Sequence, residues 1–139
     1  MIRDSEPEDM DQILPLMKEV FDKSIFKSCA YSPAEASRNF AVLSAMDHGY
    51  SKVYVEGDRI LGLLVGVVSP NQWGVKCAQD MFTYSRGGTH LLIKDFCKWA
   101  KRNGAEFVNI TDFSESERYH SLIQSIGLKK QGTVFIGGI

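Results

Sequence analysis

The sequence predicts an α/β fold, formed by one domain with a mixed, mainly antiparallel central sheet flanked by about four helices. Two amphipathic helical segments come early, three strand-like segments then follow one another, and strand alternates with helix after them. Consecutive strands joined by short turns favour antiparallel pairing. The later strand–helix–strand unit favours a parallel pair with a right-handed crossover.

Length and composition limit the classes of protein to which this chain can belong. Its 139 residues are close to the commonest size of one domain, so residues 1–139 are expected to share one core. A net charge of −1 gives no reason to expect nucleic acid, and the longest apolar run, 60–68, is too short to span a membrane. Three cysteines without a CxxC pair argue against a metal site and suit a reducing compartment. Because the first residues also lack a signal-peptide pattern, we expect a cytoplasmic protein.

The first third of the chain predicts a short strand and two helices. The strand is Ile2–Asp4, and Pro15 inside the first helix is tolerated if the regular helix begins near Asp11. The apolar positions at helical spacing are Met10, Ile13, Leu14, Met17, Val20 and Phe21. Ser32-Pro33-Ala34-Glu35 is a capping box with proline at the first helical position, so a second helix begins there and stops near Gly49.

Three strands are expected next. Residues 51–56 alternate between apolar and polar, and Gly57-Asp58 makes the turn that follows. Residues 60–68 are rich in aliphatic residues, which is typical of a central strand buried on both faces. The third strand covers residues 77–84, and a helix after Gly88 continues to Gly104.

The last part of the chain predicts strand, helix and strand again. A strand is expected over Phe107–Ile110. Ser114-Glu115-Ser116-Glu117 is a second capping box, which predicts a short helix to Ser125. Gly127-Leu128 then leads into a final β segment at Thr133–Ile136.

The segment Ser85–Thr89 reads Ser-Arg-Gly-Gly-Thr and lies between the third strand and its helix. Two glycines let the backbone turn tightly and approach a ligand with no Cβ in the way. The helix start adds free N–H groups and the positive end of a dipole. Together these predict an anion site suited to a phosphate or diphosphate, and a turn that binds nothing is the alternative.

This order of elements, with the Arg-Gly-Gly turn at that place, resembles the GNAT acetyltransferase superfamily over nearly the whole chain. Met1–Asp11 is similar to the family's opening strand and first helix. Ser85–His90 is similar to its acyl-CoA pyrophosphate loop, and Ser125–Leu128 to its motif near the C-terminus. The short loop and compact size most resemble small GNAT proteins encoded by bacteriophages, some of which are virion components.

The resemblance implies an enzyme that moves an acetyl group from acetyl-CoA to an amine by direct attack, with no acyl-enzyme. The residues implied to contact acetyl-CoA are Phe82, Thr83, Tyr84, Arg86, Gly87, Gly88, Thr89 and His90. The acceptor, a small-molecule amine or a protein amine, would enter around Phe26–Tyr31 and beside the loop that follows the strand Phe107–Ile110. A homodimer is a further expectation.

Acetyl transfer also needs a base for the amine and a proton for the departing thiolate. Asp80 is the first candidate base because it starts the strand expected to line the cleft, and Asp112 is the second. A solvated or loop-capping carboxylate is the alternative for each. Ile123 occupies the place of the family's proton-donating tyrosine. Tyr119, one helical turn earlier, or Tyr84 is the expected replacement, and a tyrosine that only covers the core is the alternative.

Two other functions stay open. The missing tyrosine favours a catalytically inactive GNAT-like domain with a structural or interaction role, such as a phage virion component or a host-factor binder. For a phage protein, the location would be the host cytoplasm or the virion. A flavodoxin-like nucleotide binder is a weaker alternative, because that fold alternates strand and helix from its start. Cys29 has no basic partner in sight and Cys97 lies among apolar helix residues, so covalent catalysis has little support.

Overall fold

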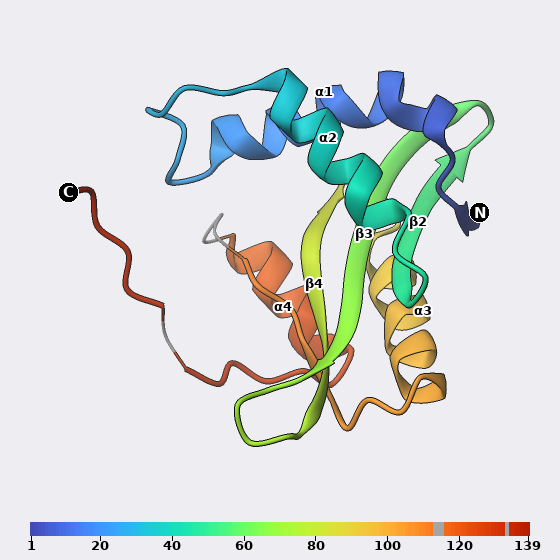
Figure 1. Ribbon diagram of the computed structural model, residues 1–139, viewed down its shortest axis with the longest axis vertical. Coiled ribbons are helices and arrows are strands. Elements are labelled where there is room, and N and C mark those ends of the chain that lie inside the picture. Colours follow the sequence, from blue (N-terminus) through green and yellow to red (C-terminus); the bar gives the residue numbers. More distant parts are fainter. Residues whose placement is uncertain (113–115, 133) are drawn as a thin grey trace.

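The structure is a computed structural model, and it describes residues 1–112, 116–132 and 134–139 (Figure 1). A five-stranded sheet runs through it in the order β1-β2-β3-β4-β5. The strands are β1 (Ile2–Asp4), β2 (Gly49–Glu56), β3 (Arg59–Pro70), β4 (Lys76–Ser85) and β5 (Phe107–Asn109). The helices are α1 (Met10–Lys23), α2 (Pro33–Ser44), α3 (Thr89–Arg102) and α4 (Glu117–Ser125), with a 3₁₀ turn at Pro7–Asp9 before α1.

The pairing of the strands confirms the predicted fold class. β1, β2, β3 and β4 pair with their sheet neighbours in antiparallel fashion, whereas β4 and β5 are parallel. α3 makes the crossover between those two parallel strands. The chain is therefore an α/β domain with a mixed, mainly antiparallel sheet, as expected from the order of its segments.

Each face of the sheet carries its own apolar core. Leu63 and Leu64 are neighbours on β3 and are both fully buried, on opposite faces. Leu63 belongs to the cluster formed with α1 and α2, and Leu64 to the cluster formed with α3, against which α4 also packs. This confirms that the central strand is buried on both faces, because successive side chains of a strand alternate between them.

The two predicted helix starts in the first third of the chain are also confirmed. The Ser32 hydroxyl accepts a hydrogen bond from the Glu35 N–H at 3.2 Å, with Pro33 in the first helical position. α1 runs from Met10 to Lys23 with Pro15 inside it, so the helix continues although Pro15 has no N–H to donate to the carbonyl four residues earlier. No helix in the described ranges is both long and apolar enough to cross a lipid bilayer.

The prediction of a final β segment at Thr133–Ile136 is wrong for Val134, Phe135 and Ile136, which belong to no strand. Thr133 lies outside the described residues, as do Ser114 and Glu115 of the second capping box. Val134, Phe135 and Ile136 have strand-forming side chains, but a strand also needs a neighbour, and none of the described strands pairs with them. In α4 the Ser116 hydroxyl caps the helix by accepting from the Tyr119 N–H at 3.3 Å.

The sheet and α3 approach each other closely at Gly66. A Cβ at this position would lie 2.5 Å from a ring carbon of Phe96 and 2.9 Å from the Gln79 carbonyl oxygen. We therefore expect Gly66→Val to lower the free energy of unfolding by about 1–3 kcal/mol, as overpacked cores do, in a urea denaturation experiment. Gly137→Val is the matched control, because nothing lies within 4 Å of a Cβ there. Equal stability of the two variants would contradict this account of the packing.

Candidate active site

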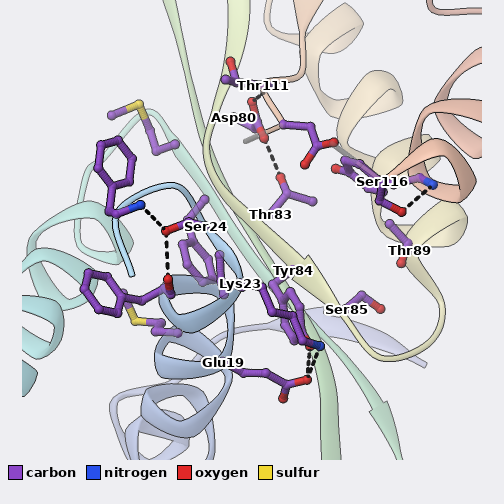
Figure 2. A pocket seen from close by; sticks show the side chains of 18 of the residues that line it. Glu19, Lys23, Ser24, Asp80, Thr83, Tyr84, Ser85, Thr89, Thr111 and Ser116 are labelled. Carbon is purple, nitrogen blue, oxygen red and sulfur yellow. Dashed lines mark hydrogen bonds and ion pairs between the residues drawn. The ribbon is translucent and has the colours of Figure 1, made fainter. Parts of the chain in front are cut away.

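A cleft of about 1680 Å³ opens between the α1–α2 side of the molecule and the second half of β4 (Figure 2). α4 and the start of α3 complete its wall. The structure brings the residues proposed from the sequence together in this one cleft. They are Asp80, Phe82, Thr83, Tyr84, Arg86, Gly87, Gly88, Thr89, His90 and Tyr119. Asp112 lines the same cleft. Their chemical roles stay predictions.

The cleft exists because β4 and β5 separate after a short paired stretch. The two strands pair only from Cys77 to Gln79 of β4, whereas β4 continues to Ser85. Opposite β3, the register shifts so that Met81 is left without a partner, which is the mark of a β-bulge. From Asp80 onward, one edge of β4 therefore has no strand beside it in the described part of the chain. Its backbone N–H and C=O groups on that edge can pair with a ligand.

Asp80 lies at the point where the two strands separate. Its Oδ1 accepts a hydrogen bond from the Thr111 N–H at 2.9 Å, and its Oδ2 accepts one from the Thr83 hydroxyl at 2.7 Å (Figure 2). Only 5% of the residue is exposed. Burial raises the pKa of this carboxyl, although both hydrogen bonds oppose the change. Asp80 thus bridges β4 to the chain after β5 and is also a stronger base than an exposed aspartate.

The glycine turn has the geometry of an anion site. Gly88 adopts φ +73° at the N-cap of α3, a conformation that favours glycine. The N–H groups of Thr89 and His90 have no hydrogen-bond acceptor among the described residues. A Cβ on Gly87 would meet only a Leu61 side-chain carbon, at 3.8 Å, so the turn is open toward the cleft. Free N–H groups at a helix start, next to an open turn, suit a phosphate group.

Arg86 is held by a residue that the sequence did not single out. Its guanidinium donates through Nε and Nη2 to Oε2 of Glu19, at 2.9 and 2.6 Å. The Tyr84 hydroxyl and the Lys23 ammonium, at 2.9 Å, both donate to the other oxygen of Glu19. Figure 2 shows Glu19, Lys23 and Tyr84 together at one end of the cleft. These bonds, with that from Tyr84 the largest effect, lower the pKa of Glu19 to about 2.

The structure separates the two tyrosines proposed as proton donors. The Tyr84 hydroxyl already donates to Glu19, which binds α1 to β4. The Tyr119 hydroxyl is buried and has no hydrogen-bond partner in the described part of the chain. Burial, together with the negative charges of Asp80 and Asp112, raises the pKa of Tyr119. Tyr119 therefore keeps its proton at neutral pH and has no partner for it within the described protein.

Ile123 and His120 both belong to α4, whereas Asp112 follows β5. Ile123 packs against the core beneath α3 and α4, so this position contributes no polar group to the cleft. The Asp112 carboxylate and the His120 imidazole lie 2.8 Å apart. His120 thus fixes a carboxylate that lines the cleft.

Tyr31 ends the range Phe26–Tyr31, where the acceptor was expected to enter, but nothing in the sequence indicated how its hydroxyl is placed. It lies between α1 and α2, and its ring packs against Phe21 with centroids 5.1 Å apart. Its hydroxyl is buried and has no hydrogen-bond partner among the described residues, as is true of Tyr119, and both tyrosines line the cleft. A buried polar atom without a partner costs free energy, and such atoms cluster where a ligand supplies the missing bond. Tyrosine in a loop carries no spacing signal that could have revealed this.

No protein-family model matches the sequence, and no curated protein matches it. Solved structures do match the fold. A transcriptional regulator from Bacillus halodurans C-125 is similar with a TM-score of 0.81 and 18% identity, covering 100% of this chain and 99% of that one. An aminoglycoside antibiotic 6'-N-acetyltransferase from Acinetobacter haemolyticus is similar with a TM-score of 0.76 and 14% identity, covering 100% and 97%.

A third solved structure contains a ligand. It is AAC(6')-Iy in complex with the bisubstrate analogue CoA-S-monomethyl-acetylneamine, with a TM-score of 0.76, 13% identity, and coverage of 100% of this chain and 97% of that one. At such identities, likeness shows the fold alone. The chain has the GNAT acetyltransferase fold, which confirms the resemblance at the level of architecture.

The ion pair between Glu19 and Arg86 makes a testable statement about anion binding. An anion that binds Arg86 has to compete with the Glu19 carboxylate. We therefore expect Glu19→Gln to bind inorganic pyrophosphate more tightly than the unmodified chain, by up to about fivefold, the range of an exposed ion pair. Isothermal titration calorimetry measures this directly.

Glu35→Gln is the control for this experiment. Glu35 also lines the cleft and also pairs with an arginine, Arg38, but that pair lies on α2 and away from the glycine turn. Its removal should leave pyrophosphate affinity unchanged. An equal gain in both variants would mean that the overall charge of the cleft, and not release of Arg86, sets the affinity.

Proposed function

We propose that this protein is an N-acetyltransferase that uses acetyl-CoA and an amine acceptor. The observation that carries the proposal is the unpaired edge of β4, which leads directly to the open glycine turn and the free N–H groups of α3, all in one cleft. That arrangement matches the shape of CoA, a long amide-containing arm ending in a diphosphate. The GNAT fold, seen elsewhere with a CoA-containing bisubstrate analogue, supports it.

The residues present fit this cofactor. The free N–H groups of Thr89 and His90 would bind the diphosphate, with the positive end of the α3 dipole behind them. Arg86 would add a charged contact once it turns from Glu19. The backbone of Phe82–Ser85 would pair with the amides of the pantetheine arm. When bound, the cofactor supplies an acetyl thioester, which is the group that an amine attacks.

Asp80 and Thr83 would receive the proton of the amine. Thr83 Oγ1 faces the cleft and lies 2.7 Å from Asp80 Oδ2. The hydroxyl accepts a proton from the attacking nitrogen while its own proton passes to the carboxylate. Burial of Asp80 favours this transfer, because it raises the pKa of the carboxyl.

Tyr119 would supply the proton for the departing sulfur. Its hydroxyl is unpaired, and its raised pKa keeps it protonated until a thiolate forms next to it. Tyr84 is less suited to the task, because its hydroxyl already donates a hydrogen bond to Glu19. The protein would thus use a tyrosine one helical turn before Ile123 for the role expected at position 123.

The acceptor would bind at the α1–α2 end of the cleft. Phe26 and Tyr31 from the loop between those helices line this end, together with Phe82 of β4. The unpaired Tyr31 hydroxyl offers a hydrogen bond to a polar group of the acceptor. A small-molecule amine and a protein amine both meet this description. We also propose a cytoplasmic location. A relation to bacteriophage proteins stays a prediction from the sequence.

A catalytically inactive GNAT-like protein with a structural or interaction role is the second candidate. The specific observation in its favour is that Glu19 already neutralises Arg86, so the guanidinium next to the glycine turn is engaged within the protein. This protein would use its surface and not the cleft. Acetyl-CoA binding separates the two candidates, as follows.

Gly87→Asp tests the cofactor site. The substitution places a carboxylate in the open turn without a clash, since only Leu61 lies near a Cβ there. We expect it to abolish acetyl-CoA binding measured by calorimetry, because the new charge repels the diphosphate. Gly137→Asp, outside the cleft, should bind as the unmodified chain does. Failure of the unmodified chain to bind acetyl-CoA would exclude the enzyme and leave the second candidate.

Tyr119→Phe tests the proton donor. Turnover with an acceptor found by screening should fall by about 10²–10⁴-fold, while acetyl-CoA affinity stays the same. Stability should rise, because the change removes a buried hydroxyl without a partner. Tyr84→Phe is the control, and there the melting temperature should fall, since a bond to Glu19 is lost. Unchanged turnover in Tyr119→Phe would assign the ring to packing alone.

Asp80→Asn tests the base while keeping both hydrogen bonds. The amide oxygen can still accept from Thr111, and its nitrogen can donate to Thr83. In the unmodified enzyme, turnover should fall as the pH drops through the raised pKa of Asp80, because a protonated carboxyl accepts no proton. The variant should turn over about 10²–10⁴-fold more slowly and lack this pH dependence.

The Asp80 carboxyl gives the stability of the protein a pH dependence opposite in sign to that of turnover. Because the folded pKa is raised, the contribution of Asp80 to stability is complete below the usual pKa of an aspartate and is lost as the pH rises through the raised value. Thermal denaturation as a function of pH should show that loss in the unmodified chain but not in Asp80→Asn.

For the turnover experiment, an identical pH profile of turnover in both proteins would rule out Asp80 as the base.

A further inference from the structure

A group of large apolar and aromatic side chains lines the end of the cleft next to α1. Three belong to α1, two to the loop between α1 and α2, and one to β4. They are Met17, Val20, Phe21, Phe26, Tyr31 and Phe82, named the aromatic end from here on. Phe26 is 40% exposed although its side chain is apolar. Covering such a ring with a ligand removes apolar surface from water, so the aromatic end favours a ligand with a flat apolar group.

Ser24, directly after α1, fixes the backbone at two of these rings. Its hydroxyl donates to the Phe21 carbonyl at 2.8 Å and accepts from the Phe26 N–H at 3.1 Å (Figure 2). The ring of Phe21 in turn packs against Tyr31. The aromatic end is therefore formed before a ligand arrives, and a preformed site loses less conformational entropy on binding.

The carboxylates that line the cleft are engaged within the described part of the chain. Glu19 is paired with Lys23 as well as with Arg86, Glu35 is paired with Arg38, and Asp112 contacts His120. The Lys23 pair remains when Arg86 turns to a phosphate. Asp80 is left, and it is the proposed base. An acceptor with several positive charges would need several free carboxylates, which the described cleft residues do not offer.

A cation already occupies two of the rings. The Lys18 ammonium lies 5.6 Å from the ring centroid of Phe21 and 5.3 Å from that of Tyr31. A second ammonium brought to the same rings would be repelled by the first, because like charges at short distance raise the free energy. The part of the acceptor that enters the aromatic end is therefore expected to be uncharged.

We infer, on the basis of the acetyl transfer proposed above, that the acceptor is an amine with one positive charge and an aromatic ring on a short arm. Its ring packs against Phe26 and Phe82, and its nitrogen faces Thr83 and Asp80. Phe82 lies two residues from Asp80 on β4, about 7 Å along a strand, which suits a ring and a two-carbon arm. A free arylalkylamine and the N-terminal aromatic residue of a peptide both have this chemistry.

Steady-state turnover with acetyl-CoA and four amines tests the inference. The amines are 2-phenylethylamine, phenylalanyl-alanine amide, butylamine and spermidine. kcat/KM for one of the two aromatic amines should exceed that for butylamine and spermidine by at least about tenfold, since burying an aromatic group is worth that factor or more. The faster aromatic amine identifies the source of the ring. Equal values for the aromatic amines and butylamine, or a preference for spermidine, would overturn the inference.

Phe26→Ser tests whether the ring is recognised at the aromatic end. This variant should lose about threefold to tenfold of the preference for the aromatic amine over butylamine, which is the contribution of an aromatic pair. Trp73→Ser is the matched control, because Trp73 is also an exposed aromatic residue, at 78%, but lies in the loop between β3 and β4 and does not line the cleft. Its preference should equal that of the unmodified chain. The same preference in Phe26→Ser would contradict the inference.

Nuclear magnetic resonance separates failure of this inference from failure of the proposed function. 2-Phenylethylamine is titrated into the unmodified chain, with and without CoA. The signals of Phe26 and Phe82 should shift, and that of Trp73 should not. A chain that shows these shifts but does not bind acetyl-CoA would contradict the acetyltransferase and leave the aromatic site standing. A chain that binds acetyl-CoA but shows no shift at the aromatic end would overturn the inference and leave the cofactor site standing.

Discussion

The separation of β4 from β5 is the constraint on which the rest of the structure depends. A parallel partner along the whole of β4 would use up the backbone groups on that edge and leave no cleft. The bulge at Met81 and the end of β5 at Asn109 prevent this pairing. Asp80 stabilises the separated arrangement, because its carboxylate takes the Thr111 N–H that continued pairing would otherwise have to satisfy.

The separation of β4 from β5 also determines which ionisable groups lie at the two ends of the cleft. At the outer end, Glu19 on α1 reaches across to Arg86 and Tyr84 and thereby ties the helical layer to the far half of β4. At the inner end, Asp80 is buried, and the Tyr119 hydroxyl has no partner in the described part of the chain. The proposed proton acceptor and the proposed proton donor thus line one cleft, with the open glycine turn beside them. This combination fits acyl transfer better than it fits a surface used only for contacts.

Much of the fold could be predicted because its signals are local. Three features depend only on neighbours in the sequence: the capping box at Ser32, the aliphatic run through Leu63 and Leu64, and the glycine turn. The pair Glu19–Arg86 could not, because it joins residues 67 positions apart on different elements. Val134, Phe135 and Ile136 show the opposite limit: their side chains have strand propensity, yet they belong to no strand, because a strand also needs a neighbouring strand to pair with.

Hydrogen–deuterium exchange at single amides, with and without CoA, tests the central claim most directly. The unpaired edge of β4 should exchange fast in the free protein, and CoA should slow exchange in Phe82–Ser85 and at Thr89 and His90. Amides of Lys52, Val53 and Tyr54 in β2, which has β1 on one side there and β3 on the other, should not respond. Protection by CoA confined to other elements, with Phe82–Ser85 and Thr89 unchanged, would contradict the view that the opening between β4 and β5 is a cofactor site.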